Sequence, residues 1–355
     1  CCWIWGLSAR TSCWTISVAN LRWLLVVLLS SVGLLGCSEQ IEEFAGPTMG
    51  SRYSVKYLRS SAGPSLVEAQ AATEAILAEV DEQLSTYRSD SLISRFNAAP
   101  AHSCQVMPES LLELVRFGEQ LSLQSAGAFD LTLEPLLNLW GFGPQARTEQ
   151  VPSAEQIAQA RERVGHRHLH INGRQLCKDV ALMVDFNSIA AGYAVDRIGA
   201  RLAQLGVSSY LVEVTGELKA QGRKADGSPW RVASEAPLDD QQVAHRVITL
   251  DGEGISTSGD YHNYFERDGR RYSHTLDPQT GAPITHTLAQ VSVVDASVQR
   301  ADGLSTLLMV LGPERGLAFA EREGIKALFV SRGEQGFVSQ SSSALQHWLA
   351  KGEQP

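Results

Sequence analysis

Hydrophobic and polar positions follow two different periods along this chain, and each period predicts a different kind of element. Apolar residues recur at helical spacing in five segments, which we expect to be helices: 65–84, 108–124, 153–164, 193–205 and 300–311. Alternation of apolar and polar residues, typical of half-buried strands, marks much of the remaining chain. The strand segments are 53–57, 166–179, 208–222, 230–236, parts of 245–275, 288–294 and 326–341.

The order of these elements predicts the fold class. Strands and helices are mixed without the regular strand–helix–strand succession of a parallel sheet, which favours an α+β fold. No repeat and no low-complexity linker divides the chain. We therefore expect two intertwined lobes and not two separate domains joined by a linker.

Residues 254–283 form the most polar and turn-rich stretch of the chain. Asp268-Gly269 is typical of a type I′ turn between two strands, and the residues from Asp277 to Gly281 favour a second turn. The polar side chains crowded at these turns are Ser256, Thr257, Ser258, His262, Tyr264, His274 and Asp277. Polar groups gathered at turns between strands can build a site, so this stretch is the first candidate.

The N-terminal region has the pattern of an export signal. Arg22 precedes an apolar run of about 13 residues, which is too short to span a bilayer comfortably. Leu34-Leu35-Gly36-Cys37 follows and resembles a bacterial lipoprotein signal, in which the cysteine is lipidated after cleavage. We expect a signal peptide over 1–36, lipidation at Cys37 and a short tether over 37–46. An uncut signal anchor is the alternative, and residues 1–20 are open to being a start-site or fragment artefact, because position 1 is not Met.

Composition and charge narrow the classes of function. Apolar residues make up 44% and charged residues 19% of the 355 positions, which is typical of a folded protein. The net charge of −9 and the lack of a long basic segment argue against nucleic acid as a partner. Cys104 and Cys177 are the only cysteines after Cys37, and the sequence leaves open whether they pair.

Two short patterns indicate oxygen ligands. Asp302 and Thr306 are four positions apart in an apolar helical run, so their side chains share one helix face. Hard cations such as Mg²⁺ take such ligands, although the spacing alone favours a solvated Asp and a Thr bonded to its own helix. Asp185 and Ser188 lie where a strand leads into a helix, which suits an anion or a metal, or plain capping of that helix.

Histidines supply the other candidates. His274 lies just before the predicted turn at Asp277, where a neutral imidazole can take a proton from an attacking hydroxyl, although a lone histidine is more often structural. His166, His168 and His170 alternate on one predicted strand and so share a face. A zinc site there lacks an evident fourth ligand, and we interpret the alternation as incidental.

Eight motifs, in this order, resemble those of the ApbE family of FAD:protein FMN transferases. They are GPTMGS, STYRSDSLISRFN, GAFDLTLEPLLNLWGFG, VDFNSIAAGYAVDRI, YLVEVTGELKAQG, ISTSGDYHNYF, YSHTLDPQTGAPI and ADGLSTLLMVLG. The likeness extends from Gly46 to about Leu349. It implies an ApbE-like fold over 47–350, with FAD bound between the two lobes.

The resemblance also implies a reaction. FAD is bound with Mg²⁺, its diphosphate is split, FMN is joined through a phosphoester to a Thr or Ser of a target protein, and AMP leaves. Targets in this family are flavin-carrying subunits of membrane redox complexes, such as sodium-translocating NADH:quinone reductase and its relatives. Members are often lipoproteins of the bacterial periplasm, so we expect a lipid anchor in the inner or outer membrane.

Matching the motifs residue by residue implies a set of site residues. The FAD positions are Met49, Tyr87, Ala128, Phe129, Asp130, Asp185 and Leu276. The Mg²⁺ positions are Ser188, Asp302 and Thr306, with Ser305 giving a backbone carbonyl. His274 matches the base. Some relatives carry Asp at the position of Ser305, which concerns whether that side chain is a ligand. Many carry glycine at the positions of Asn187 and Thr215, so the local backbone is expected to differ at these two residues.

Two other functions use the same residues. An FAD pyrophosphatase would release free FMN and AMP, with water in place of the protein hydroxyl. A non-catalytic flavin-binding lipoprotein would bind FAD without turnover, although the joint presence of His274, Asp302 and Thr306 argues against a decayed site.

Overall fold

The computed structural model describes residues 40–145, 150–235, 244–261 and 263–352. These residues belong to one compact unit that begins at Gln40. Cys37 and the predicted signal peptide lie outside the described residues, so lipidation and export stay predictions. Within the described ranges, no helix is long and apolar enough to cross a membrane.

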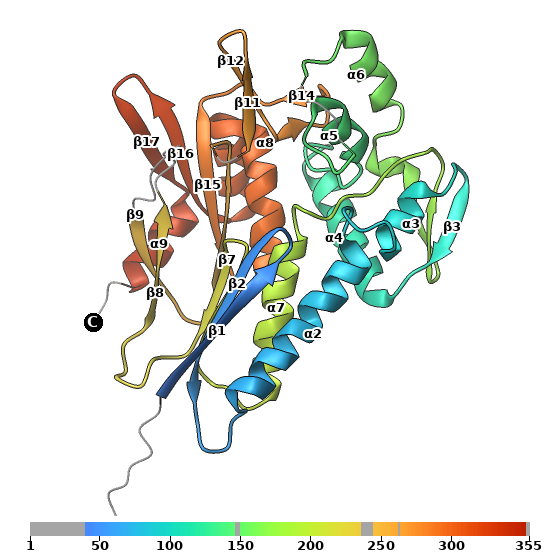
Figure 1. Ribbon diagram of the computed structural model, residues 1–355. Coiled ribbons are helices and arrows are strands. Elements are labelled where there is room, and N and C mark those ends of the chain that lie inside the picture. The colour runs from blue at the N-terminus through green and yellow to red at the C-terminus, as the bar shows by residue number, and fades with distance from the viewer. Residues whose placement is uncertain (1–39, 146–149, 236–243, 262, 353–355) are drawn as a thin grey trace, which may run out of the picture. The chain divides into compact units, whose positions relative to one another are not determined.

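An antiparallel sheet of eight strands organises the fold (Figure 1). Its order is β1-β2-β6-β7-β10-β15-β16-β17, and every neighbouring pair is antiparallel. The strands are β1 (Gln40–Thr48), β2 (Ser51–Arg59), β6 (Tyr210–Val214), β7 (Glu217–Gln221), β10 (Gly254–Gly259), β15 (Leu288–Asp295), β16 (Lys326–Gly333) and β17 (Gly336–Ser341). Together with the helices, this sheet confirms the predicted α+β class.

Eight α-helices accompany the sheet in the described part of the chain. They are α2 (Leu66–Leu84), α3 (Leu92–Ala98), α4 (Glu109–Gln124), α5 (Glu134–Trp140), α6 (Ala154–Arg161), α7 (Ala190–Gln204), α8 (Val298–Glu323) and α9 (Ser343–Gly352). The predicted capping box of Ser153 with Gln156 begins α6, and a second one at Ser65 begins α2. Helices α7 and α8 pack on the sheet, and α2 packs on α7 (Figure 1).

The middle of the sheet is buried on both faces, and its strand residues alternate between two cores. In β16, Ala327 and Phe329 join the large core that contains α7 and α8. Leu328 and Val330 point the other way, into a second core with the hairpin of β8 (Trp230–Glu235) and β9 (Ala244–Leu250) and with α9. The second core explains why β15 is buried along nearly its whole length.

Two small hairpins follow β10 and lead toward the candidate site. Strands β11 (Tyr264–Arg267) and β12 (Arg270–Ser273) are joined by Asp268 and Gly269, both with positive φ, which confirms the predicted type I′ geometry. Strands β13 (Leu276–Asp277) and β14 (Ala282–Pro283) enclose the second predicted turn.

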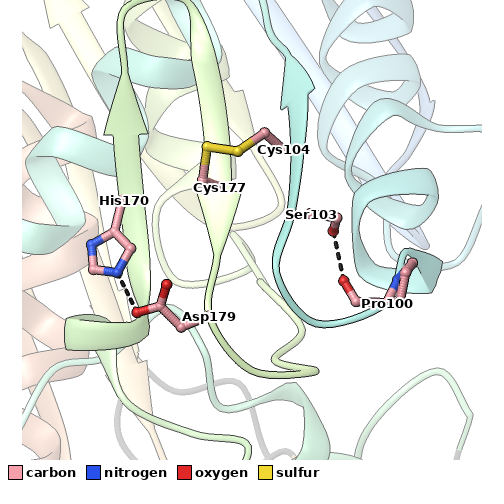
Figure 2. The surroundings of a disulfide bond; sticks show 6 residues. All are labelled: Pro100, Ser103, Cys104, His170, Cys177 and Asp179. Carbon is pink, nitrogen blue, oxygen red and sulfur yellow. Dashed lines mark hydrogen bonds and ion pairs between the residues drawn. A yellow bond between two sulfur atoms is a disulfide. The ribbon is translucent and has the colours of Figure 1, made fainter.

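The two cysteines whose pairing the sequence left open form a disulfide. Cys104 in β3 (Ser103–Val106) faces Cys177 in β5 (Gln175–Lys178), and their sulfurs are bonded (Figure 2). Strand β4 (Leu169–Asn172) completes this small sheet. Cross-linking residues 73 positions apart restricts the unfolded chain, which typically stabilises a fold by about 2–4 kcal/mol.

The structure corrects two predictions of local structure. Residues 40–46, predicted as part of a tether, belong to β1, where the backbone pairs with β2 although Phe44 is the only buried side chain of the strand. His166 and His168 lie in a 3₁₀ turn and do not share a strand face with His170. The first difference reflects backbone pairing between strands, which side-chain periodicity does not report, and the second reflects a local turn before β4.

The apolar helix predicted to end at residue 311 does end there. Gly312 has φ 77° and breaks the helical path, and Pro313 begins the second half of α8. A Cβ at Gly312 would lie 2.6 Å from the His286 ring, so the position requires glycine for both conformation and space.

Candidate functional site

A cavity of about 360 Å³ lies where the polar end of β10 meets α8, the loop before α7 and the loop before α5. Nine of the residues predicted for the site line it: Ala128, Phe129, Asp130, Asp185, Ser188, His274, Leu276, Asp302 and Thr306. Segments that are far apart in the sequence thus converge as the motif matches implied. Among the described residues, its walls carry four carboxylates, of Asp130, Asp185, Glu217 and Asp302, and no lysine or arginine.

Asp302 is the most enclosed acid of this wall. It is 5% exposed, and its Oδ2 accepts a hydrogen bond of 3.0 Å from the amide of Gly192. Helix α7 approaches α8 closely at this point, because a Cβ at Gly192 would lie 2.4 Å from the Val298 carbonyl. Burial and the neighbouring Glu217 carboxylate raise the pKa of Asp302 well above its ordinary value. Such a group is suited to a cation that offsets its charge.

Hydroxyl groups surround this carboxylate. Ser256 Oγ lies 3.4 Å from Asp302 Oδ1, and Ser258 Oγ lies 2.8 Å from Ser305 Oγ and 3.4 Å from Thr306 Oγ1. Thr306 lines the cavity, as predicted from its position one turn after Asp302. Ser305 does not line it: the side chain is fully buried and donates to the Asp302 carbonyl at 2.9 Å.

The loop before α7 presents Asp185 and Ser188 to the cavity. Asp185 does not cap the helix; its carboxylate accepts from the amide of Asn187 at 2.6 Å, and α7 begins after Ile189 without a side-chain cap. Burial raises the pKa of Asp185 to about 6. The plain capping interpretation of this segment is therefore wrong, and Ser188 remains oriented as a lining residue.

Asp130 holds the opposite loop in place. Its Oδ1 accepts from the amide of Thr132 at 2.8 Å, and its Oδ2 accepts from the amide of His166 at 2.8 Å. The 3₁₀ turn that contains His166 is therefore tied to the cavity wall through its backbone.

Within the described ranges, no group of three or more His, Cys, Asp or Glu side chains is arranged to hold a metal. His170 instead pairs with Asp179 (Figure 2).

His274 is oriented by the backbone of Asn263. Its Nδ1 lies 2.9 Å from the Asn263 carbonyl oxygen, which can only accept, so Nδ1 carries the proton in the neutral ring. The lone pair is then on Nε2, the tautomer that a general base requires. A second bond, from the His274 amide to the same carbonyl at 3.1 Å, fixes the residue at the end of β12.

Aromatic packing holds this hairpin against the neighbouring helix. Phe265 stacks on Tyr272 at 5.0 Å and on Phe142 at 5.5 Å, measured between ring centroids. The Phe142 ring also meets the His274 ring edge-on at 6.4 Å. Trp140 Nε1 donates to the Gly281 carbonyl at 2.8 Å, which anchors the turn after β13. The base candidate is thus placed by a packed scaffold and not by a loose loop.

Met49 and Tyr87 lie in a second hollow of about 190 Å³, beside the main cavity. Asn187 lines both, so the two hollows adjoin. The β1–β2 turn, with Met49 at φ 47° and Gly50 at φ 72°, carries Met49 there. Tyr87 is 70% exposed. The predicted flavin contacts are therefore brought together with each other, but in a separate compartment from Asp302 and His274.

Behind the cavity, a buried polar network contains a glutamate that the motif matches did not mark. Glu134 is 1% exposed, and its Oε2 accepts from Asn97 Nδ2 at 2.9 Å. The same Asn97 amide donates to the Val184 carbonyl at 2.9 Å, next to Asp185. Burial, reinforced by the Asp185 charge, raises the pKa of Glu134 to about 8. The folded protein therefore keeps Glu134 protonated at neutral pH.

The raised pKa of Glu134 predicts that the free energy of unfolding depends on pH. The ordinary pKa of 4.5 applies to Glu134 in the unfolded chain, so between pH 4.5 and about 8 unfolding releases a proton and stability falls as pH rises. Glu134→Gln keeps an acceptor for Asn97 and removes this titration. In urea unfolding, the free energy of unfolding of the variant relative to wild type should therefore increase by about 1–3 kcal/mol from pH 5 to pH 7.5. Equal pH slopes would contradict this, and exposed Glu119→Gln on α4 is the control.

Known proteins of one family match this chain over most of its length. The model of the ApbE family matches residues 49–329. An FAD:protein FMN transferase of Vibrio cholerae is 42% identical over 92% of this chain and 99% of its own. One of Escherichia coli K12 is 39% identical over 76% of this chain and 78% of its own.

Solved structures give the same result. The apo form of the Pseudomonas stutzeri flavinyl transferase ApbE superposes with a TM-score of 0.82 at 64% identity, covering 87% of this chain and 96% of that one. The Vibrio cholerae flavin transferase ApbE superposes with a TM-score of 0.80 at 40% identity, covering 87% and 99%. The family model covers more than half of the chain, and these relatives are 39% to 64% identical to it. This chain therefore belongs to the ApbE family.

Proposed function

We propose that this protein transfers FMN from FAD to a Thr or Ser hydroxyl of a target protein and releases AMP. The observation that carries the proposal is one cavity that holds an oriented histidine, His274, together with the oxygen ligands Ser188, Asp302 and Thr306. Positioning and charge neutralisation are what phosphoryl transfer requires of a protein. The relatives that match over most of the chain are FAD:protein FMN transferases.

The two adjoining hollows fit an extended dinucleotide. FAD has a flavin at one end, an adenosine at the other and a diphosphate between them. We place the flavin ring near Met49 and Tyr87, where it would cover an aromatic side chain that is 70% exposed. The main cavity then receives the diphosphate and the adenosine half, against Phe129 and Leu276.

We propose that Mg²⁺ is bound by Ser188, Asp302 and Thr306. The donor set fits this ion, because it consists of one carboxylate and hydroxyls, which are hard oxygen ligands. The cavity walls also need a cation, since they carry four carboxylates and no basic side chain among the described residues, whereas the substrate is a diphosphate. When bound, Mg²⁺ neutralises the diphosphate and the charge developing on the leaving group, a contribution of typically several kcal/mol.

His274 then acts on the incoming hydroxyl. The hydroxyl oxygen forms a bond to the FMN phosphorus, the bond from that phosphorus to the bridging oxygen breaks, and AMP leaves. The hydroxyl proton passes to Nε2 of His274, whose tautomer is set by the Asn263 carbonyl. Water at the same position would give free FMN and AMP. The acceptor hydroxyl must therefore displace water if transfer is to exceed hydrolysis.

The decisive experiment separates transfer from hydrolysis and from simple binding. Purified protein is incubated with FAD, Mg²⁺ and a candidate acceptor domain, and the acceptor is analysed by intact mass. We expect a mass increase of one FMN, with AMP released in equal amount and no increase when Mg²⁺ is omitted. Free FMN with an unmodified cognate acceptor would establish a pyrophosphatase, and absence of both products would leave a flavin-binding protein.

We further propose the acceptor class and the location that the resemblance implies. The acceptors are flavin-carrying subunits of membrane redox complexes, such as sodium-translocating NADH:quinone reductase, and they are the first domains to use in the transfer experiment. The chain is a periplasmic lipoprotein anchored through Cys37, which lies outside the described residues. The supporting observation is the Leu34-Leu35-Gly36-Cys37 motif after an apolar run, and the mass of the mature N-terminal peptide tests it.

A further inference from the structure

Glu217 lines the same cavity as Asp302, although neither its sequence context nor the motif matches gave it a role. It is the first residue of β7, directly after the turn that joins β6 to β7. Its Oε1 lies 3.5 Å from Ser256 Oγ, and that same hydroxyl lies 3.4 Å from Asp302 Oδ1. One serine thus stands between two carboxylates, and its single proton can satisfy only one of them.

The side chain of Glu217 is held by an unusual neighbour. Thr215 Oγ1 donates to Glu217 Oε2 at 2.9 Å. Thr215 has φ 54° and Gly216 has φ 111°, so a β-branched residue occupies a left-handed position that strongly favours glycine. Such a conformation strains the backbone. What threonine adds there, and glycine does not, is the hydroxyl that fixes Glu217.

The carboxylates of Glu217 and Asp302 lie at the same end of the cavity, and their charges indicate what that end can bind. Two carboxylates that repel each other at one end of the cavity, with no lysine or arginine among the described lining residues, favour a divalent cation between them. The same pair repels a diphosphate when no cation is present. A role limited to hairpin structure would not require the carboxylate to line the cavity.

We propose that Glu217 is the second carboxylate of the divalent-cation site, and that Thr215 is the residue that positions it. This inference rests on the Mg²⁺ site of the proposed function and deepens it. Glu217 contributes its charge to holding the cation that Asp302 and Thr306 bind, and it makes tight FAD binding dependent on that cation.

The test measures binding by the flavin-free protein, so that it does not depend on FMN transfer. Mn²⁺ is the probe, and its dissociation constant is determined by titration with electron paramagnetic resonance of the free ion. Partners of metal ligands typically change metal affinity by about 10–100-fold when removed, and we expect a loss in this range for Glu217→Gln. Metal-free FAD binding should change in the opposite direction, becoming several-fold tighter, because one negative charge is removed.

Glu119→Gln is the control. Glu119 is exposed on α4 and does not line the cavity, so its replacement takes away the same charge without changing the site. We expect its affinities for Mn²⁺ and FAD to stay within about twofold of wild type.

Thr215 supplies the second pair of variants. Thr215→Gly relieves the backbone but loses the hydroxyl, so Mn²⁺ binding should weaken by several-fold while thermal stability is kept or raised. Thr215→Ser retains the hydroxyl and should restore most of the affinity. Unchanged Mn²⁺ binding in Glu217→Gln would overturn the proposal, as would parallel loss of Mn²⁺ and metal-free FAD binding. If Glu217→Gln fails to fold, equal Mn²⁺ affinities of the Gly and Ser variants would overturn it.

Discussion

Asp302→Ala is expected to lower the rate of FMN transfer by at least about 10³-fold and to abolish its dependence on Mg²⁺. The factor corresponds to about 4 kcal/mol, which is the size of the charge stabilisation that a bound cation supplies to phosphoryl transfer. Among the three ligands Ser188, Asp302 and Thr306, Asp302 supplies the carboxylate and the other two supply hydroxyls, while Glu217 adds its charge nearby. Removal of Asp302 therefore takes away most of the direct electrostatic attraction for the cation.

The measurement is the initial rate of acceptor flavinylation as a function of Mg²⁺ concentration. Asp302→Asn is the sharper companion variant, since its amide oxygen still accepts from the Gly192 amide that binds Asp302 Oδ2 at 3.0 Å. Burial and the Glu217 charge destabilise the Asp302 carboxylate in the metal-free protein. We therefore expect Asp302→Asn to be at least as stable as wild type in urea unfolding without metal, while it is inactive. A wild-type Mg²⁺ dependence in either variant would refute the ligand assignment.

The sequence predicted much of the cavity because its residues lie in local patterns with recognisable chemistry. Asp302 and Thr306 are one turn apart on an apolar helix, and the structure places both on the cavity wall. Family motifs supplied the rest, including the Ala128–Asp130 segment, whose contribution no periodicity would indicate. The helix ends were also predictable, since Gly312 and Pro313 break α8 where the apolar pattern stops.

Other features depend on pairing between distant segments and have little local signal. Glu217 is a single acid after a hairpin turn, and only the register of β7 beside β10 brings it near Asp302. The first strand reads as a polar tether because Phe44 is its only buried side chain, yet its backbone pairs with β2 along its whole length. Glu134 looks like an ordinary first-turn helix acid, and its burial follows from the position of α5 against Asn97.

The acidic cavity connects these observations. A wall of carboxylates is unsuited to a diphosphate, and the protein has not balanced it with lysine or arginine in the described lining. We therefore expect affinity for FAD to depend on the proposed cation, which would link substrate binding to assembly of the reactive site. A basic residue would hold the diphosphate without this condition, but it would also compete with the cation for Asp302.

His274→Ala is expected to lower FMN transfer by about 10²–10⁴-fold while FAD and Mn²⁺ binding stay within about twofold of wild type. The side chain lines the cavity, and its Nδ1 bond to the Asn263 carbonyl leaves Nε2 as the basic atom. Loss of the imidazole removes the proton acceptor for the attacking hydroxyl. It removes no charge from the cation site, so binding and reaction are affected separately.

Single-turnover flavinylation with enzyme-bound FAD isolates this effect from substrate affinity. Added imidazole should restore part of the rate in His274→Ala, because a small base can enter the space that the side chain leaves. His347→Ala removes an exposed histidine of α9 outside the cavity and should transfer FMN at the wild-type rate. Loss of FAD binding in His274→Ala would assign the residue to substrate binding instead. Retained binding with a rate that imidazole restores would identify His274 as the base that takes the proton of the acceptor hydroxyl.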